Sequence, residues 1–422
     1  MVRRCMNHKV TFDRLAMVRV VFLHPDLGIG GAERLVVDAA LALKRKGHEV
    51  QFFTAHHDSS HCFPETRDGQ LKVTCVGDWL PRSIFGKLAA FWAYVRMVYV
   101  ALYLVLLSGV SYDVVFVDQV SACIPFLRLK HAKVIFYCHF PDQLLTQRKS
   151  LLKKIYRYVL DNLEERTTSS ADCVLVNSHF TAGVYLETFR SIKVSPSVLH
   201  PSLDFENFDK FSDITCKDVN IDVPGECLFL SLNRYERKKN LGLALESLKV
   251  LFDRLDESER ANIHLIMAGG YDDRVQENIE HYKELLSVAK ILGISDKVTF
   301  LKSPSDKEKI ALLRAARCLI YTPDKEHFGI VPIESMYVGT PVIAVESGGP
   351  KETIVNGVTG FLCSQTPEDF AEAMYTLVKD SSKKQSMGKL GHDRVVSHFS
   401  FAKFSEHLDY IVQGLMDERK QR

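Results

Sequence analysis

The chain has 422 residues, of which 46% are hydrophobic and 25% are charged, and its formal net charge at pH 7 is +2. A chain of this length and hydrophobic content can bury at least two cores, and no compositional bias indicates a disordered or repetitive protein. Its ten cysteines are scattered, with neither a CxxC pair nor metal-ligand spacing, which predicts buried, reduced thiols.

The N-terminal segment, residues 1–17, is basic and interrupted by polar side chains, so it lacks the apolar stretch of a signal peptide and is left unassigned. No N-x-S/T sequon occurs in the chain. Residues 1–205 carry 25 Lys and Arg against 18 Asp and Glu, whereas the remainder carries 29 against 34. We therefore expect a cytosolic protein body whose first half is the part nearer to anionic lipid, and no nucleic-acid partner.

Short apolar strands alternate with helical stretches through residues 18–205, which predicts a parallel sheet with helices on both faces. The expected strands are Arg19–Leu23, Glu49–Thr54, Val73–Val76, Val114–Val117, Lys133–Cys138, Cys173–Asn177 and Val198–His200. Open parallel sheets bind ligands at the carboxyl ends of their strands. The residues that directly follow these strands are therefore candidates for function.

A glycine-rich loop, His24–Glu33, follows the first strand. Gly28, Gly30 and Gly31 allow its backbone to approach a phosphate closely. A dinucleotide fingerprint needs G-x-G-x-x-G, but Glu33 stands at the third glycine position and no acidic residue ends the next strand. NAD binding is therefore only the second interpretation of this loop.

An apolar run, Lys87–Val110, has a single internal charge at Arg96 and is long enough to span a bilayer of about 30 Å. A spanning helix would place strands of one sheet on opposite sides of a membrane, so we expect this helix to lie in the membrane interface. The alternative is a buried helix of the first domain. A basic amphipathic segment supports membrane contact, and its residues are Leu144, Leu145, Arg148, Lys149, Leu151, Leu152, Lys153, Lys154, Ile155, Tyr156 and Arg157.

Polar residues also follow the strand Lys133–Cys138. His139 stands between this strand and a loop marked by Pro141 and Asp142, so we expect its imidazole to reach the ligand-binding edge of the sheet. The alternative is a histidine that is satisfied in the core.

The periodicity stops after about Leu203, and residues 206–225 are interpreted as a linker. A second alternation predicts another Rossmann-like domain over residues 226–400, followed by a C-terminal helix over 401–422. Its expected strands are Cys227–Asn233, Ile263–Ala268, Val298–Leu301, Cys318–Thr322 and Val342–Val345.

Two cations, Arg234 and Lys239, lie between the strand Cys227–Asn233 and a helix. Fixed cations there can stabilise the charge that develops on a departing phosphate. The alternative is the solvated basic start of a helix. The chain contains no Asp-x-Asp pair of the kind that holds a divalent metal on a diphosphate, so we expect protein cations to act instead, with no metal site and no cofactor.

The most informative segment has two carboxylates, Glu326 and Glu334, eight residues apart. They flank a turn at Gly329 that opens a helix near Ile330. Glu326 is expected to face a sugar ring, and Glu334 a ribose. Gly329 and Ile330 are expected to border the same ligand.

Two glycine pairs at strand ends complete the expected site. Gly348 and Gly349 precede a helix, where backbone amides can hold a diphosphate, and Gly269 and Gly270 end a strand where backbone can pack against a nucleotide. Together with the two carboxylates, these residues predict recognition of a nucleotide-diphosphate sugar.

These segments resemble the retaining GT-B glycosyltransferases of the glycogen-synthase-like family 4, whose E-x7-E motif matches Glu326–Glu334. The phrases DQVSACIP, FYCHFPD, NRYERKKNL and EHFGIVP resemble, within that family, the eukaryotic α-1,3/1,6-mannosyltransferases of lipid-linked oligosaccharide assembly. The resemblance runs from Val20 to the late helices. It implies an α/β fold of the GT-B type, with two facing Rossmann-like domains, a cleft between them and a C-terminal helix that returns to the first domain.

The resemblance also implies roles for particular residues. Arg234 and Lys239 are then the active pair on the diphosphate, and His139 lies against the donor sugar. Apart from the resemblance, Asp118 and Gln119 directly follow the strand Val114–Val117, so we expect them to line the acceptor side. The donor is expected to be GDP-mannose and the acceptor Man1GlcNAc2-diphosphodolichol, which receives an α-1,3 and then an α-1,6 mannose with retention. Front-face attack and a short-lived covalent intermediate both stay open.

The expected location is the endoplasmic reticulum membrane, with the catalytic domains on the cytosolic side and lipid contacted through the apolar helix and the basic segment. Association with other enzymes of the same N-glycosylation pathway is a further expectation. The alternatives are a GT-B transferase for another nucleotide sugar or lipid acceptor, an NAD-dependent dehydrogenase, and a non-catalytic membrane scaffold.

Overall fold

The structure is a computed structural model that describes residues 16–84, 88–146, 148, 150–192 and 194–420. Its contacts divide the chain into two compact units. The first unit contains the described residues up to Leu175, Phe189–Pro196 and the residues from Ser405 onward, and the second contains Val176–Thr188 and Ser197–Phe404. The unassigned segment 1–17 lies almost entirely outside the described residues.

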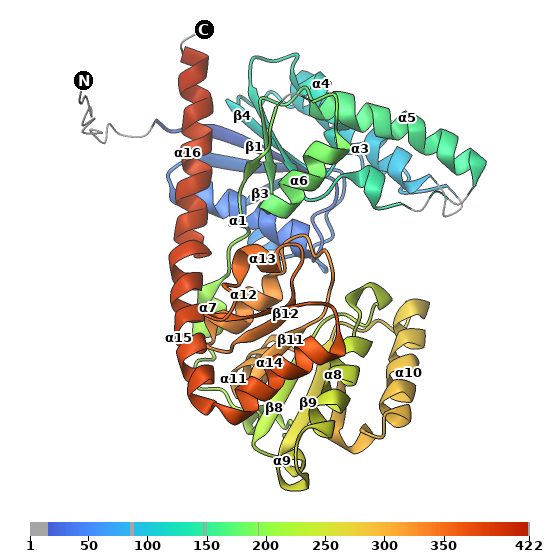
Figure 1. Cartoon of the computed structure of the whole chain (residues 1–422). Coiled ribbons are helices and arrows are strands. Elements are labelled where there is room, and N and C mark those ends of the chain that lie inside the picture. Colours follow the sequence, from blue (N-terminus) through green and yellow to red (C-terminus); the bar gives the residue numbers. More distant parts are fainter. Residues whose placement is uncertain (1–15, 85–87, 147, 149, 193, 421–422) are drawn as a thin grey trace, which may run out of the picture. The chain divides into compact units, whose positions relative to one another are not determined.

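The first unit is built on a sheet with the strand order β3-β2-β1-β4-β5-β6-β7 (Figure 1). The pairs β3–β2, β2–β1, β1–β4 and β4–β5 are parallel. The strands are β1 (Arg19–His24), β2 (Glu49–Thr54), β3 (Lys72–Cys75), β4 (Val114–Asp118), β5 (Lys133–Cys138), β6 (Cys173–Val176) and β7 (Ser197–Val198). Because the chain runs outward to β3 and then returns to the other side of β1, the topological switch point lies between β1 and β4, where such sheets bind ligands.

Helices and short 3-10 turns connect these strands. They are α1 (Gly31–Arg45), α2 (Pro64–Arg67), α3 (Ala89–Leu106), η1 (Ser121–Cys123), α4 (Ile124–Leu127), η2 (Asp142–Leu144), α5 (Leu151–Thr168) and α6 (His179–Thr188). The strands β1, β4 and β5 are almost entirely buried, as their continuous apolar sequences predict. The alternation of strands and helices expected over residues 18–205 is confirmed.

Residues 89–106 of the expected apolar helix form α3, which packs on the first sheet rather than standing apart from it. Met97, Val100 and Leu104 are fully buried, and the Arg96 guanidinium donates to the Ala55 carbonyl at 2.7 Å. Among the described residues, α3 is the one helix that is long and apolar enough to cross a membrane, a test that core helices also pass. Its packing favours the buried-helix interpretation for the inner face of α3.

The second unit has a six-stranded parallel sheet with the order β10-β9-β8-β11-β12-β13. Its strands are β8 (Cys227–Leu232), β9 (Ile263–Gly269), β10 (Val298–Lys302), β11 (Cys318–Tyr321), β12 (Val342–Val345) and β13 (Gly360–Cys363). Its helices and 3-10 turns are α7 (Phe205–Asp209), η3 (Lys217–Val219), η4 (Arg237–Lys239), α8 (Gly242–Asp253), α9 (Glu257–Ala261), α10 (Gln276–Ile291), η5 (Ser295–Lys297), α11 (Asp306–Ala315), α12 (Ile330–Tyr337), α13 (Pro350–Thr353), α14 (Pro367–Lys379) and α15 (Ser381–His398).

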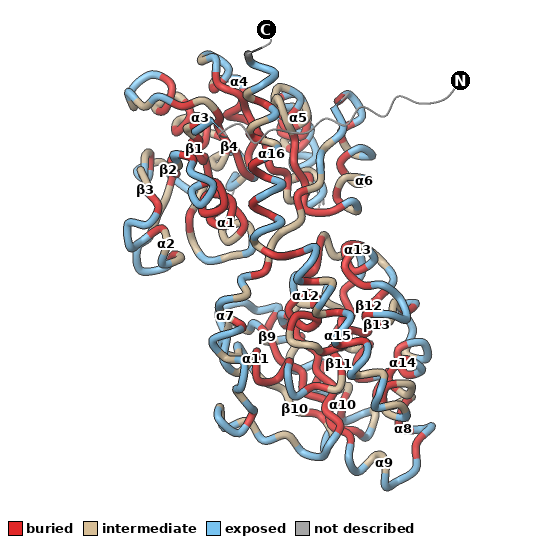
Figure 2. Tube along the Cα trace, turned by 90° about the vertical axis from the view of Figure 1, so that its left-hand side faces the viewer, coloured by how far each residue is buried: buried red, intermediate tan, exposed pale blue. Residues whose placement is uncertain are grey.

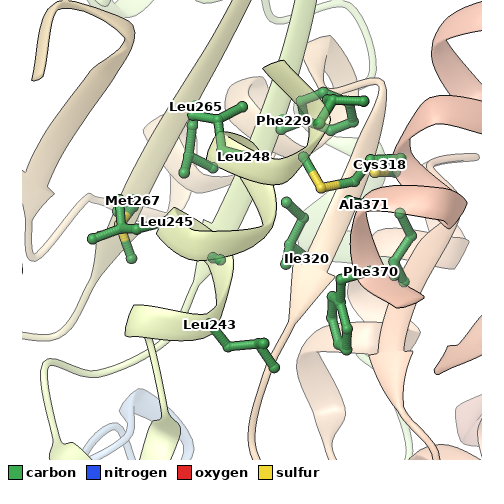
Figure 3. Packing of buried hydrophobic residues seen from close by; sticks show 14 of the residues in the cluster. Phe229, Leu243, Leu245, Leu248, Leu265, Met267, Cys318, Ile320, Phe370 and Ala371 are labelled. Atoms are coloured by element: carbon green, nitrogen blue, oxygen red, sulfur yellow. The ribbon is translucent and has the colours of Figure 1, made fainter. Parts of the chain in front are cut away.

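The core of the second unit lies on both faces of this sheet. On one face, Phe229, Leu265 and Ile320 of the strands pack against Leu248 of α8 and Phe370 of α14 (Figure 3). In both units the buried residues concentrate along the strands and the inner sides of the helices, while the outer sides are exposed (Figure 2). The sheet is thereby held rigid, and its strand ends are fixed in place for chemistry.

The segment expected as a linker, 206–225, is instead part of the second unit. It begins within α7, where Phe208 is buried, Phe205 stacks on Tyr337 with ring centroids 4.2 Å apart, and Asp209 accepts a hydrogen bond from the Tyr337 hydroxyl at 2.8 Å. The aromatic residues scattered among the aspartates cover the core, a role that a search for periodicity does not detect.

The C-terminal helix α16 (Phe401–Lys420) returns to the first unit, as expected, and its residues from Ser405 onward belong to that unit. Asp409 is buried on this helix and its carboxylate lies 2.9 Å from His48 Nε2, just before β2. The other ring nitrogen of His48 accepts from the Val18 amide at 3.1 Å. One imidazole therefore joins the C-terminal helix to the start of the sheet.

Candidate active site

Three histidine and aspartate side chains meet at the carboxyl ends of β1, β4 and β5 in the first unit. His24 Nδ1 lies 2.8 Å from Asp118 Oδ2, and His139 Nε2 lies 2.8 Å from Asp118 Oδ1. His24 and Asp118 are completely buried, whereas His139 is partly exposed. The expected placement of His139 at the edge of the sheet is what the structure shows, and its immediate partner is Asp118.

The electrostatics of this group favour ionised side chains. Burial by itself raises the pKa of Asp118, but the neighbouring His139 and His24 lower that pKa to about 2. Burial alone lowers the pKa of His24, yet hydrogen bonds to Asp118 and Glu33 raise that pKa to about 9. Asp118 and His24 are therefore held as an ion pair inside the first unit at neutral pH.

The glycine-rich loop leads into α1, which begins at Gly31. A Cβ atom at Gly30 would lie 2.2 Å from the carboxylate oxygen Oε2 of Glu33, so a larger residue there would displace the end of the Glu33 side chain. No atom lies within 4 Å of a Cβ at Gly31, and a Cβ at Gly28 would make only ordinary contacts. The expected approach of phosphate to Gly28 and Gly31 stays a prediction.

In the second unit the ammonium group of Lys239 is paired with the carboxylate of Glu326. Lys239 ends the 3-10 turn after β8, and its carbonyl accepts a hydrogen bond from the Thr322 hydroxyl at 2.7 Å. Burial is the largest effect on Glu326 and by itself raises its pKa, but the charge and hydrogen bond of Lys239, together with the charges of His327 and Lys238, lower the pKa overall. Two residues 87 positions apart in the sequence are thus brought together as a charged pair.

Arg234 follows β8 and is 62% exposed, and its guanidinium lies 2.8 Å from Glu236 Oε1. Lys238 reaches the other oxygen of the same carboxylate at 3.1 Å. Arg234 and Lys239 therefore both lie near the carboxyl end of β8, with different partners.

Glu334 lies in α12 and is buried against Lys309 of α11, with 3.0 Å between Glu334 Oε1 and Lys309 Nζ. Burial raises the pKa of Glu334, and the Lys309 ammonium only partly offsets that effect. Gly329 caps α12 with φ of 83°, a left-handed conformation that favours glycine. Ile330, the next residue, is partly exposed at the start of the helix.

The remaining predicted glycines are places where backbone segments approach each other closely. A Cβ at Gly269 would lie 1.8 Å from the Asn233 carbonyl oxygen, and a Cβ at Gly348 would lie 2.3 Å from the Glu326 carbonyl oxygen. The Gly349 amide donates to that same Glu326 carbonyl at 2.8 Å, so this amide is used within the protein. Gly270 is less tightly enclosed, next to the Arg234 side chain.

A tyrosine that sequence reasoning missed connects the second-unit groups. Tyr321 ends β11 and is buried, and its pKa is raised well above the ordinary value by burial first and then by Glu326, with Glu334 and Arg234 also acting on it. Its hydroxyl lies 3.4 Å from a Cβ built at Gly329. A polar residue at the end of a buried strand was the available signal. Lys309 was missed because it lies one helix away from the motif that it supports.

One group of potential metal ligands occurs among the described residues, and it consists of His179, His200 and Glu352. Glu352 accepts hydrogen bonds from the backbone amides of His179 and Phe180 at 2.9 and 2.7 Å and lies 3.1 Å from His200 Nε2. The carboxylate thereby caps the start of α6. His200 also stacks on Phe328 with ring centroids 5.7 Å apart, so this group adjoins the segment Glu326–Glu334.

Comparison with known proteins gives the class of this fold and site. The family described as Glycosyltransferase Family 4 matches residues 29–206, and the family described as Glycosyl transferases group 1 matches residues 217–394. The structure of sucrose-phosphate synthase from Thermosynechococcus elongatus superposes with a TM-score of 0.72 at 20% identity, covering 95% of this chain and 100% of that one. The chain is a glycosyltransferase with the GT-B fold.

Full-length relatives narrow the family further. The chain is 52% identical over 414 residues to "Alpha-1,3/1,6-mannosyltransferase ALG2" of Homo sapiens, which covers 96% of this chain and 98% of the relative. It is 39% identical over 440 residues to the protein of the same name from Saccharomyces cerevisiae, covering 95% and 86%. The chain belongs to the ALG2 family of alpha-1,3/1,6-mannosyltransferases. The dehydrogenase interpretation is thereby set aside.

Proposed function

We propose that this enzyme transfers mannose from GDP-mannose to Man1GlcNAc2-diphosphodolichol, forming an α-1,3 and then an α-1,6 linkage with retention. The observation that carries this proposal is the charged pair Lys239–Glu326 within a chain of the ALG2 family. The names of the relatives supply the sugar and both linkages, and the residues supply the chemistry.

The second unit holds the donor. Lys239 and Arg234 bind and stabilise the diphosphate as charge develops on it, and a preorganised cation is more effective in the transition state than in the ground state. Glu326, kept ionised by Lys239, orients the hydroxyl groups of the mannose. Glu334, fixed by Lys309, holds the ribose.

The nucleoside lies at the ends of β9 and β10. A cavity of 670 Å³ there is lined by Tyr271, Asp272, Lys302 and Ser303, among others. The Lys302 ammonium lies 3.9 Å from the centre of the Tyr271 ring, which holds one wall of the cavity in place. Gly269 and Gly270 border the same strand end, where Gly269 allows close packing against the Asn233 backbone and Gly270 lies next to the Arg234 side chain.

Donor binding is proposed to need no divalent metal. The chain has no Asp-x-Asp pair to carry a metal on the diphosphate, while Arg234 and Lys239 supply fixed positive charge at the end of β8. Activity in the presence of chelator is the corresponding expectation.

The enzyme is proposed to work at the cytosolic face of the endoplasmic reticulum, with the first unit against lipid. The outward face of α5 presents Leu151, Leu152, Ile155, Tyr158 and Val159, which are all more than half exposed. Lys153 and Lys154 lie on the same helix and suit anionic headgroups.

Two members of the expected basic segment do not contribute to this face. Arg157 is buried between Asp142 and Asp161, at 2.9 Å from each carboxylate, and Arg148 also pairs with Asp161. Their charges are neutralised within the first unit. Lys149 lies outside the described residues.

The decisive experiment incubates the purified enzyme with GDP-mannose, chelator and a lipid diphosphate that carries a one-mannose chitobiose core, and weighs the products by mass spectrometry. Two added hexoses are expected. Arg234→Ala should lower the rate about a hundredfold, the usual loss for one electrostatic donor. Lys238→Ala is the matched control because it pairs with the same Glu236 and lies outside the expected site.

Two results would contradict parts of the proposal. Turnover with a nucleotide sugar other than GDP-mannose would remove the donor assignment, and complete dependence on added Mg²⁺ or Mn²⁺ would remove the metal-independent role of Arg234 and Lys239. Equal losses in Arg234→Ala and Lys238→Ala would show that surface charge, rather than a specific contact, is responsible.

A further inference from the structure

Two carboxylates and two imidazoles alternate in one connected group at the carboxyl edge of the first sheet. From one end the order is Glu33, His24, Asp118 and His139, with successive distances of 3.4, 2.8 and 2.8 Å. These residues come from the start of α1 and from the ends of β1, β4 and β5. The group therefore spans the switch point of the sheet, where a ligand is expected.

The ion pairs of this group indicate which ring nitrogens carry protons. Ionised carboxylates can only accept hydrogen bonds. Both ring nitrogens of His24 face carboxylate oxygens, so both carry protons and His24 is an imidazolium. For the same reason His139 carries a proton on Nε2, which faces Asp118.

The glycine-rich loop is shaped to admit the Glu33 carboxylate to this group. The position that a Cβ would occupy at Gly30 lies 2.2 Å from Glu33 Oε2, so an alanine at this position would displace the carboxylate from its place beside His24. Glu33 is 20% exposed and its pKa is lowered, burial being opposed by the hydrogen bond to His24. The loop thus allows a carboxylate charge to lie inside the first unit, in addition to presenting backbone at the surface of that unit.

The backbone conformation of the residue after Asp118 is a further indication of a functional site. Gln119 has φ of 61°, a left-handed conformation that is uncommon for residues other than glycine and that clusters at functional sites. Because Gln119 directly follows β4, this conformation turns the chain immediately after the buried carboxylate.

We propose that Glu33 and His24 are positioning residues of the active site, which act through Asp118 to hold His139 in one ring orientation and one tautomer. His139 is the member of the group that is expected to meet the donor sugar, so this inference rests on the proposed function. Glu33 and His24 touch neither sugar nor phosphate in this scheme. They keep Asp118 ionised and in place, and Asp118 orients the imidazole.

Other titratable groups near Asp118 do not disturb this arrangement at neutral pH. Tyr137 and Cys138 of β5 are the neighbours, and burial raises the pKa of both well above the ordinary value. They are therefore neutral. Glu164, whose pKa burial raises to about 7, accepts hydrogen bonds from the Asp142 and Gln143 amides in the loop after His139, and it is common to the wild type and both variants compared below.

The test compares Glu33→Gln with Glu65→Gln. Glu65 is a matched control because it is 21% exposed, pairs with Arg34 on the same helix α1 at 2.9 Å, and lies outside the connected group. Glu33→Gln should lower kcat on the order of tenfold to a hundredfold, the loss typical of a misplaced catalytic group, with a smaller change in KM for GDP-mannose. It should also shift the pH profile of kcat, whereas Glu65→Gln should keep both kcat and its pH profile.

Gly30→Ala removes the same contact between Glu33 and His24 in a different way, because its methyl group displaces the Glu33 carboxylate. If the glycine acts through Glu33, the double variant should be no slower than either single variant. Additive losses would mean that Gly30 serves phosphate instead. If Glu33→Gln does not fold, as judged by its thermal transition, the pH profile of kcat of Gly30→Ala is decisive, because loss of a backbone contact to phosphate would leave that profile unshifted.

The outcomes separate the inference from the proposed function. Absence of mannose transfer by the wild-type enzyme would overturn the function itself. Wild-type transfer, together with folded Glu33→Gln and Gly30→Ala variants whose kcat and pH profiles match those of Glu65→Gln, would overturn the positioning role alone.

Discussion

At the scale of single residues, His24 links the chemistry of the first unit to its stability. It is completely buried and has a pKa of about 9, against an ordinary value of 6.5. Because the folded state binds this proton more tightly than the unfolded chain, the resulting stabilisation is complete below about pH 6.5. It is lost as the pH rises through about 9.

The corresponding prediction concerns the free energy of unfolding at pH 6.5 and pH 9.5. The wild type should lose up to about 3 kcal/mol more than His24→Gln between these two values, since the variant has no proton to lose there. Urea titrations of both proteins measure the difference, and contributions from cysteines and tyrosines cancel because both proteins share them. Equal losses in the two proteins would show that His24 is not an imidazolium in the folded state.

The predicted site residues divide into two kinds at this scale. Glu326 and Glu334 were found from their spacing, because the turn and helix between them are local features of the sequence. Their partners Lys239 and Lys309 lie 87 and 25 residues away from them, and no local pattern assigns either pair. Lys239 was predicted for its place after a strand, yet its pairing with Glu326 was not.

At the scale of elements, the hydrophobicity of a helix does not by itself decide whether α3 or α5 presents more apolar surface to solvent. The more apolar helix, α3, buries Met97, Val100 and Leu104 against the first unit. The amphipathic helix α5 keeps a row of large apolar side chains exposed. The two helices meet where the Phe91 amide donates to the Tyr156 hydroxyl at 3.0 Å, so the exposed start of α3 adjoins α5.

This arrangement predicts that the outward face of α5 binds lipid. Ile155→Glu should lower the fraction of protein that floats with anionic liposomes by about tenfold, because burial of one such side chain contributes about 1.5 to 3 kcal/mol. Ile291→Glu is the matched control, since Ile291 is an exposed isoleucine on α10 of the second unit. Unchanged flotation of Ile155→Glu would move the lipid contact to another surface.

At the scale of the whole chain, the first unit is completed by residues from the opposite end of the sequence. Asp409 of α16 and His48 are both buried and 361 positions apart. Removing one partner of such a pair leaves a buried polar group unsatisfied, which costs about 1 to 3 kcal/mol. The C-terminal helix therefore contributes to the stability of a unit whose first strand begins near residue 19.

Asp409→Ala should accordingly lower the melting temperature by about 5 °C. Glu418→Ala tests the same helix at a pair whose carboxylate is exposed, because Glu418 is 64% exposed and lies 3.6 Å from Lys133, which keeps Asp172 as a partner at 3.7 Å. That variant should lose less than about 1 kcal/mol, as exposed ion pairs generally do. Similar losses in both variants would mean that burial of the His48–Asp409 pair adds nothing.

The sequence by itself determined the order of strands and helices, the two α/β units and the motif Glu326–Glu334, because each depends on periodicity or on turn residues within a short window. Tertiary structure decided the rest. It packed the inner face of α3 on the first sheet, added the four-residue strand β13, folded the expected linker onto the second unit and buried Arg157 between two aspartates. It also joined Glu33, His24, Asp118 and His139, since contacts between distant strand ends depend on which strands become neighbours, and that choice is made only when the whole sheet packs.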